Sequence, residues 1–434
     1  MVHSLKGALV LTCVMLGCSA RMPGEDSAGA GSTRTDLPPS GRPTCLDAPV
    51  GCTAENGVHE LAGYDPALAS GDLAPVAAAV ASADIVGLGE AAHASAGFIG
   101  FKIRLSRELV ERHGFRAVMW ETARVPARAL DAYVQTCAGD PADAVKKGLD
   151  PIWADTLTRE FARWLCEWNK AHPGDRVQVH GFDVQDPASD RSELEQFFAE
   201  ASPSDAKSWM APLAACEQMD YEACKDGLKT VWTRLHDREA ELIAHSSPSA
   251  LATARIALTS YEAWQHESMI SDYAKSFEAR DIGMAKVVQK LRDLHFPGKK
   301  ALVWAHNIHV VKNHETVQES WVGGPIVTQG TQLDRDLGPG RYRTLALIGL
   351  DVWLDRPGQK GQVVPTPSPA SLEERLDELG KRALFVDLRD PAVSQVVPPG
   401  RLFELGAPGV EIHAPAANYD GLVYLEHSPM ADRL

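Results

Sequence analysis

Residues 83–121 decide the fold, and they read ADIVGLGEAAHASAGFIGFKIRLSRELVERHGFRAVMWE. The apolar run 83–89 predicts a short buried strand, and a second run, 115–120, ends at Glu121. Between them, apolar residues recur at the three-to-four-residue spacing of one helix face: Phe98, Phe101, Leu105 and Leu109. Gly114 follows this pattern as a helix stop. The stretch therefore predicts a strand, a helix and a second strand in succession.

The same alternation continues along the chain. Further apolar or β-branched runs predict strands at 176–182, 299–305, 343–350, 383–388 and 421–428. Strands that alternate with helices indicate an α/β fold with a mostly parallel central sheet flanked by helices. Residues 192–295 have helical periodicity and no convincing strand, so we expect a helical insertion that forms a lid or pocket wall. The α/β core would then comprise residues 61–191 and 296–434.

Acidic residues and histidines follow the ends of several predicted strands. They are Glu90 with His93, Glu121, Asp183, and His306 with His309. Ligands of open α/β sheets bind outside the carboxyl ends of the strands, so we expect these side chains to gather at one edge. His314 lies in a charged, loop-like stretch and is interpreted as a surface residue.

Three functional interpretations fit this cluster. In the first, His93 removes a proton from water, and Glu90 or Glu121 orients its ring. No G-x-S-x-G elbow occurs, which favours activated water over a serine nucleophile such as Ser95. In the second, the same glutamates and histidines bind Zn²⁺ or Mn²⁺. In the third, the protein binds a small molecule without catalysis, and His93 is a hydrogen-bonded structural residue at a helix start.

Charge and the N-terminal sequence limit the partners. The 434-residue chain has a formal net charge of -15 and no cluster of Lys and Arg, which argues against nucleic acid. Residues 1–18 resemble a lipoprotein signal peptide, in which Cys18 would carry the lipid. Met15 stands where leucine is more usual, and simple cleavage after Ala20 is the alternative. Residues 19–60 are rich in Gly, Ser and Pro and predict a flexible tether. We therefore expect an extracytoplasmic protein that meets the membrane only through its lipid anchor.

The remaining cysteines suit an oxidising compartment. Six cysteines follow Cys18, and they can pair in about 15 ways. Sequence proximity favours Cys45 with Cys52 and Cys216 with Cys224, which leaves Cys137 with Cys166. Buried free thiols are the alternative.

Four blocks of this sequence resemble the erythromycin esterase family, in family order. The first runs from Gly89 to Glu121 and contains the family's G-E-x-x-H motif. The second, residues 151–183, has a Trp-rich helix before a strand that ends at Asp183. The others are RDIGMA at 280–285 and VWAHNIHV at 303–310. One block alone is weak evidence, whereas four in order are specific.

The resemblance implies ester or lactone hydrolysis by water that His93 activates, without a cofactor. Glu90, Glu121, His306 and His309 would support the reaction. It also draws attention to Arg280 and Asp281, which we expect to fix the hinge of the helical insertion. The sequence does not identify the small-molecule substrate, and a macrolide is a candidate only by analogy with the family.

This chain departs from the family pattern inside the first block. Ala94 and Ser95 replace the family's Gly and Thr, and Gly97 stands where an acid is usual. Lys102 replaces an arginine, and Arg104 is a candidate to substitute for it. Lysine keeps the charge but lacks the two-pronged geometry of a guanidinium. These changes lie in the expected pocket, so they bear on the choice of substrate more than on the chemistry.

Overall fold

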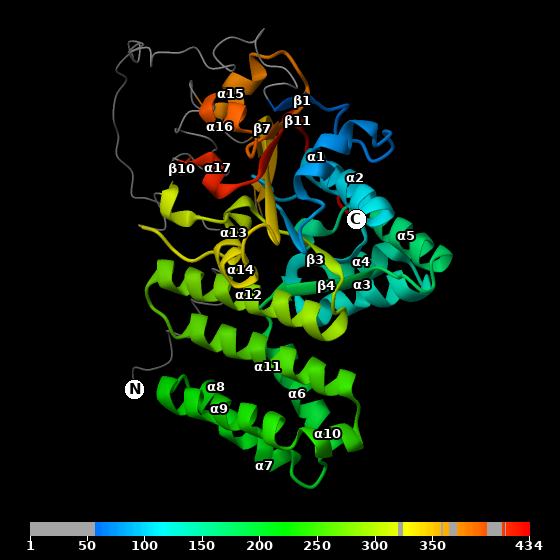
Figure 1. Cartoon of the computed structure of the whole chain (residues 1–434). Coiled ribbons are helices and arrows are strands. Elements are labelled where there is room, and N and C mark those ends of the chain that lie inside the picture. Colours follow the sequence, from blue (N-terminus) through cyan, green and yellow to red (C-terminus); the bar gives the residue numbers. More distant parts are fainter. Residues whose placement is uncertain (1–56, 320–323, 357–358, 364–370, 397–409, 413) are drawn as a thin grey trace.

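The computed structural model describes residues 57–434 except 320–323, 357–358, 364–370, 397–409 and 413 (Figure 1). The predicted signal peptide, Cys18, most of the tether and the Cys45–Cys52 pair lie outside the described residues. The tether prediction runs three residues too far, because Val58–Glu60 forms strand β1 and pairs antiparallel with strand β9 (Ala383–Asp387). This pairing covers what would otherwise be an open sheet edge.

A nine-stranded sheet forms the centre of the molecule, in the order β1-β9-β11-β7-β2-β5-β3-β4 with β8 added to β7. Its remaining strands are β2 (Ile85–Leu88), β3 (Phe115–Ala123), β4 (Gln178–Asp183), β5 (Lys300–Trp304), β7 (Tyr342–Arg356), β8 (Gln359–Val363) and β11 (Gly421–Ser428). The pairs from β11 through β7, β2, β5 and β3 to β4 are all parallel. The α/β prediction is therefore confirmed. Strands β6 (Val317–Glu319) and β10 (Val410–Ile412) form a separate antiparallel pair.

Helices cover both faces of this sheet (Figure 1). The core helices are α1 (Ala74–Val80), α2 (Ala96–His113), α3 (Arg124–Thr136), α4 (Pro141–Gly148), α5 (Thr156–Ala171), α13 (Asn307–Val310), α14 (Gln329–Leu337), α15 (Leu372–Asp377), α16 (Pro391–Val396) and α17 (Pro415–Asn418). On one face, Phe98 and Phe101 of α2 pack with Trp120 and Trp304. Helix α2 ends at Gly114, whose φ of 75° is the left-handed conformation that glycine adopts without strain.

Between β4 and β5 the described chain contains helices and no strand. They are α6 (Pro187–Ala201), α7 (Ala206–Met210), α8 (Ala214–Glu217), α9 (Tyr221–Asp237), α10 (Glu239–His245), α11 (Pro248–Ser268) and α12 (Tyr273–His295). Helix α12 lies between the sheet and α11 (Figure 1), and its Met284 and Leu291 pack on the second sheet face. Phe198, Trp209 and Leu258 belong to a separate apolar core. The helices between β4 and β5 therefore form an apolar core of their own, and the last of them, α12, packs on the sheet.

Two disulfides occur in the described residues. Cys137 at the end of α3 bonds to Cys166 of α5, and Cys216 bonds to Cys224. The pairing of Cys216 with Cys224, which sequence proximity favoured, and that of Cys137 with Cys166, which it left over, are both confirmed. Among the described residues, no helix is long and apolar enough to cross a bilayer.

Candidate functional site

Glu90 and His93 lie in the loop that joins β2 to α2. Nδ1 of His93 is 2.7 Å from Oε1 of Glu90, and Nζ of Lys102 donates to Oε2 of Glu90 at 2.8 Å. The side chains of Glu90 and Lys102 are fully buried, whereas that of His93 is 27% exposed. Burial lowers the pKa of Lys102, although Glu90 opposes this shift. Glu90 and Lys102 thus form a buried ion pair, and Glu90 also hydrogen-bonds to the partly exposed ring of His93.

The hydrogen bond to Glu90 sets the tautomer of His93. A carboxylate only accepts, so Nδ1 of the ring carries the proton and Nε2 of the neutral ring keeps a free lone pair. Of the two glutamates that the sequence offered as the orienting group, the structure places Glu90 in contact with the ring. His93 therefore has the arrangement of an oriented general base.

His306 lies beside His93, with 5.3 Å between the ring centroids. Its Nε2 is 3.2 Å from the carbonyl oxygen of Ala91, which can only accept, so Nε2 carries the proton and Nδ1 does not. Burial, together with the neighbouring His93, lowers the pKa of His306 to about 3. His306 is thus a neutral imidazole with an acceptor nitrogen.

The loops that carry these histidines are fixed to each other. The backbone N–H of Asn307 donates to the carbonyl oxygen of Glu90 at 2.9 Å. A side chain at Gly89 is excluded, because a Cβ there would stand 2.1 Å from Oδ1 of Asn307. Trp153 lies edge-on to His93, with centroids 5.6 Å apart, and donates from Nε1 to the carbonyl oxygen of Glu121.

A second cluster, of charged side chains around His309, surrounds Glu121 at the end of β3. Nε2 of His309 is 3.2 Å from Oε1 of Glu121, and its Nδ1 is 2.7 Å from Oδ1 of Asp281. Burial alone would lower the pKa of His309, but the two carboxylates outweigh it and raise that pKa to about 10. His309 is therefore an imidazolium at neutral pH. The other oxygen of Glu121 accepts the backbone N–H of His306 at 3.0 Å, which links the two clusters.

Arg280 of α12 completes this second cluster. Its Nε and Nη2 donate to both oxygens of Asp183 at 3.0 and 2.7 Å, and Nη2 also reaches Glu121 at 3.3 Å. Burial would raise the pKa of Glu121, but His309 and Arg280 hold it well below its usual range. Side chains at or just after the ends of the four parallel strands β2, β3, β4 and β5 therefore meet at one sheet edge.

A family model described as erythromycin esterase matches residues 110–428 of this chain. The chain belongs to the erythromycin esterase family. The match contains Glu121, Asp183, Arg280 and both histidines of the VWAHNIHV block, whereas Glu90 and His93 lie just before it.

Relatives of this erythromycin esterase family member include a putative hydrolase, YbfO, of Bacillus subtilis, which is 23% identical over 379 residues and covers 79% of this chain and 83% of that protein. Erythromycin esterase type I of Escherichia coli is 32% identical over 120 residues, 27% of this chain and 28% of that enzyme. A solved Bacillus cereus protein superimposes with a TM-score of 0.73 at 20% identity and covers 88% of this chain and 97% of that one. The erythromycin esterase EreC, as a histidine-to-asparagine variant in its open conformation, gives 0.66 at 21%, with 84% and 95% covered. These two structures share the fold.

Two residues of this family member lie elsewhere than the sequence suggested. Arg104 does not join the cluster, since it donates to both oxygens of Asp72 and to the carbonyl oxygens of Gly63 and Ala69. The surface interpretation of His314 is wrong, because that residue is 1% exposed. The backbone N–H of Ile326 donates to its Nδ1 at 3.3 Å.

Three acidic groups near the cluster were not predicted from the sequence. Burial raises the pKa of Asp155 to about 6, and burial with the nearby Asp183 raises that of Asp150 to the same value. Burial raises the pKa of Glu267, at the end of α11, to about 7. Asp155 lies within the second family block and Asp150 directly precedes it, which was the available signal. No sequence signal marked Glu267, because it follows no predicted strand.

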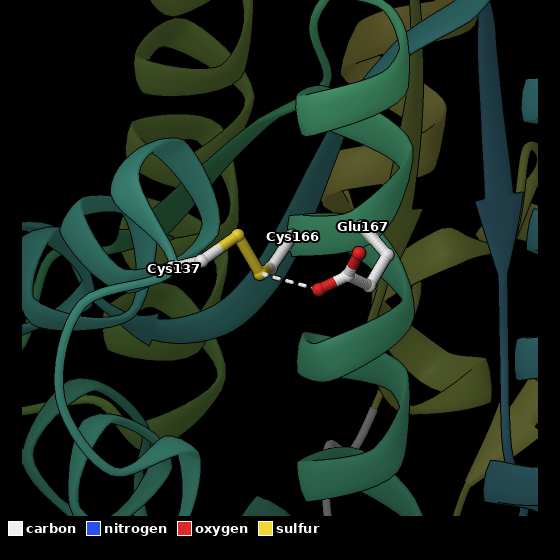
Figure 2. Close-up of side chains that lie close together, drawn as sticks. All are labelled: Cys137, Cys166 and Glu167. Carbon is white, nitrogen blue, oxygen red and sulfur yellow. Dashed lines mark hydrogen bonds between the residues drawn. A yellow bond between two sulfur atoms is a disulfide. The ribbon is translucent and has the colours of Figure 1, made fainter.

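The carboxylates of the cluster are already engaged and do not offer free oxygens to a metal ion. Both oxygens of Glu90 are paired with His93 and Lys102, and those of Glu121 with His309, Arg280 and the His306 N–H. Among the described residues, three candidate ligand atoms come close together only at Cys137, Cys166 and Glu167 (Figure 2). Those two sulfurs form a disulfide and offer no thiolate.

Proposed function

We propose that this protein hydrolyses a carboxylic ester or lactone of a small molecule, with water as the nucleophile. The observation that carries the proposal is the hydrogen bond from Nδ1 of His93 to Glu90, which leaves Nε2 of a partly exposed ring as the base. Membership of the erythromycin esterase family supports the reaction class. The named relatives support it as well, since one is an erythromycin esterase and another a putative hydrolase.

The proposed reaction moves one proton through His93. Nε2 takes a proton from water as its oxygen attacks the carbonyl carbon. The tetrahedral intermediate then collapses, its bond to the leaving oxygen breaks, and the protonated His93 returns the proton to that oxygen. The products are a carboxylic acid and an alcohol, which remain one molecule when the substrate is a lactone. Glu90 holds the ring in the required tautomer and stabilises its transient positive charge.

His306 and Ser95 have supporting parts in this scheme. Because Nε2 of His306 donates to Ala91, we assign its free Nδ1 as an acceptor that orients the water. Ser95 is fully buried and hydrogen-bonds to Ser428, so it is poorly placed to attack a substrate. This geometry favours water as the nucleophile over a serine.

Hydrolysis of an ester and lactone panel in H₂¹⁸O tests the proposal. We expect one ¹⁸O atom in the carboxylate product of a single turnover, and full activity after dialysis against a chelator. Loss of activity that Zn²⁺ or Mn²⁺ restores would favour the metal-dependent hydrolase instead. Tight binding of a panel member without turnover would favour a non-catalytic binding protein.

We also propose that the protein works in an oxidising, extracytoplasmic compartment. The two disulfides of the described residues support this, because such bonds are rare in reducing compartments. Intact-mass analysis of protein from its native host, with thiol alkylation, tests both the disulfides and lipidation at Cys18. Alkylation of Cys137 and Cys166 without prior reduction would contradict it.

A further inference from the structure

The residue that follows His93 has an unusual backbone conformation. Ala94 has a φ of 59°, in the left-handed region that glycine adopts freely and a residue with a Cβ adopts at a cost. Ala94 is also buried, so its conformation is set by the groups around it. The direction in which the chain leaves His93 depends on this residue.

A short segment from the other end of the described chain holds Ala94 in place. The N–H of Ala431 donates to the carbonyl oxygen of Ala94 at 2.8 Å, and the N–H of Ala96 donates to the carbonyl oxygen of Pro429 at 2.7 Å. Ser95 and Met430 form the antiparallel bridge between these two bonds. The two backbone hydrogen bonds therefore flank Ser95, and one of them fixes the carbonyl group of the left-handed Ala94.

Small residues at the start of α2 leave room for this segment. Ser95 donates from Oγ to the carbonyl oxygen of Ser428 at 3.2 Å. Gly97 leaves the space that Ser428 occupies, because a Cβ at Gly97 would stand 2.4 Å from Oγ of Ser428. The small residues at positions 94–97 thus fit the close approach of residues 428–431.

The same segment reaches the second element that touches His93. The N–H of Thr156 donates to the carbonyl oxygen of Asp432 at 2.8 Å, and the N–H of Leu434 donates to that of Ala154 at 3.1 Å. This stretch directly follows Trp153, whose ring lies against His93. Residues 429–434 therefore join the loop that carries His93 to the loop that carries Trp153.

We propose that residues 429–434 are a positioning element for His93, which hold Ala94 in its left-handed conformation and so keep Nδ1 of His93 on Glu90. This inference rests on the proposed function for its kinetic consequence, but the orientation of the ring can be measured without any substrate. Ala431 acts through its backbone N–H and does not touch the reacting atoms.

The test compares Ala431→Pro, which removes the N–H to Ala94, with Ala431→Gly, which keeps it. We expect Ala431→Pro to lower kcat about 10²-fold, the usual effect of a small misplacement of a reacting group, with little change in KM. Ala431→Gly should retain the wild-type kcat. The substrate is the ester or lactone that the hydrolysis panel identifies.

Ala94→Gly is the rescue background. Glycine adopts the left-handed conformation unaided, so Ala431→Pro should cost much less kcat in that background. Equal losses in both backgrounds, accompanied by equal falls in Tm, would overturn the proposal in favour of a purely structural role. If Ala431→Pro does not fold, a chain truncated after Met430 replaces it, because it also lacks the N–H to Ala94, and unchanged kcat in that variant would overturn the proposal.

The substrate-free readout is the ¹⁵N NMR signal of the His93 ring, assigned by its loss in His93→Asn. Wild type and Ala431→Gly should show one tautomer with a proton on Nδ1, and Ala431→Pro should show a mixture. A single unchanged tautomer in Ala431→Pro would overturn the proposal. If no ester is cleaved by the wild type, the proposed function fails, and the NMR comparison still decides the positioning role.

Discussion

The site contains two glutamate–histidine pairs that behave differently. His93 contacts one carboxylate, that of Glu90, and its side chain is 27% exposed. His309 lies between two carboxylates, Glu121 and Asp281, and its side chain is 4% exposed. The first ring keeps a nitrogen free, whereas both nitrogens of the second are occupied.

The two rings are the same residue type, so the difference between them comes from their environment. A second carboxylate and full enclosure turn His309 into a fixed cation, which neither accepts nor releases a proton near neutral pH. It balances the charge of Glu121, and Glu121 in turn holds the backbone of His306. The His309 cluster is thus a rigid support for the region where His93 would act.

The largest expected effect is a difference in kcat between variants of the two histidines, His93 and His309. His93→Asn should lose about 10² to 10⁴ in kcat, the usual contribution of a general base, because asparagine cannot take the proton. His309→Asn should lose less kcat, since both ring nitrogens of His309 are occupied by carboxylates and cannot take a proton from water. Initial rates on the identified ester, with circular dichroism as a folding control, measure both. A His309→Asn variant that loses more turnover than His93→Asn would reverse the assignment.

Glutamine substitution at Glu121 and at Glu90 should lower the stability of the protein by different amounts. Glu121→Gln removes one carboxylate from both Arg280 and His309, and arginine cannot lose its proton. Each cation keeps one carboxylate partner, so we expect a loss of about 1–3 kcal/mol in the free energy of unfolding. Glu90→Gln should cost less, because burial already lowers the pKa of Lys102 and that ammonium can release its proton. Urea unfolding of the two variants measures the difference. Equal losses would mean that Lys102 stays charged without its partner.

The third expectation is a pH dependence of stability. The pKa of His309 is raised to about 10 from an ordinary 6.5, so its stabilising effect is complete below pH 6.5 and is lost as pH rises through 10. The difference in Tm between wild type and His309→Asn should therefore shrink across that range. His306→Asn is the matched control: the pKa of His306 is lowered to about 3, so its contribution changes only below pH 6.5. A His309 difference that stays constant up to pH 10 would contradict the buried imidazolium.

The smallest effect is expected at Glu267, which accepts two hydrogen bonds from Gln185 at the edge of the charged cluster. Burial raises the pKa of Glu267 to about 7 from 4.5, so its contribution to stability is lost as pH rises from 4.5 through 7. Glu267→Gln keeps a neutral side chain and should raise Tm by about 2–4 °C above pH 7, with no gain at pH 4.5. Calorimetry at the two pH values measures this, and an equal gain at both would exclude titration as the cause.

The sequence predicted which strand ends carry the site, because strand and helix periodicity are local properties. It left open which glutamate contacts His93, since that depends on the side-chain geometry of a loop. Arg104 was not available to replace Lys102, because residues two apart on a helix point about 200° apart. Arg280 and Asp281 were found through the family resemblance, and their contacts with Asp183 and His309 require the packing of α12 on the sheet.

The role of residues 429–434 could not be predicted in the same way. The segment pairs with a loop more than 330 positions earlier, and no periodicity in either stretch predicts the contact. The replacement of the family's glycine by Ala94 was visible in the sequence. Its left-handed backbone was not, because that conformation is unusual for alanine and is held by distant partners.

The position of β5 in the sheet has a consequence for biosynthesis. β5 lies between β2 and β3, yet it follows both in the chain, after the whole helical segment. A nascent chain that has emerged only as far as β4 therefore lacks the strand that joins β2 to β3, and Glu90 and Glu121 have no common framework. The apolar core within residues 194–261 consists of contacts closer in sequence, which form faster than contacts between distant segments. As the chain emerges, the helices would thus collapse before the sheet edge of the candidate site exists, and insertion of β5 would be the step that assembles it.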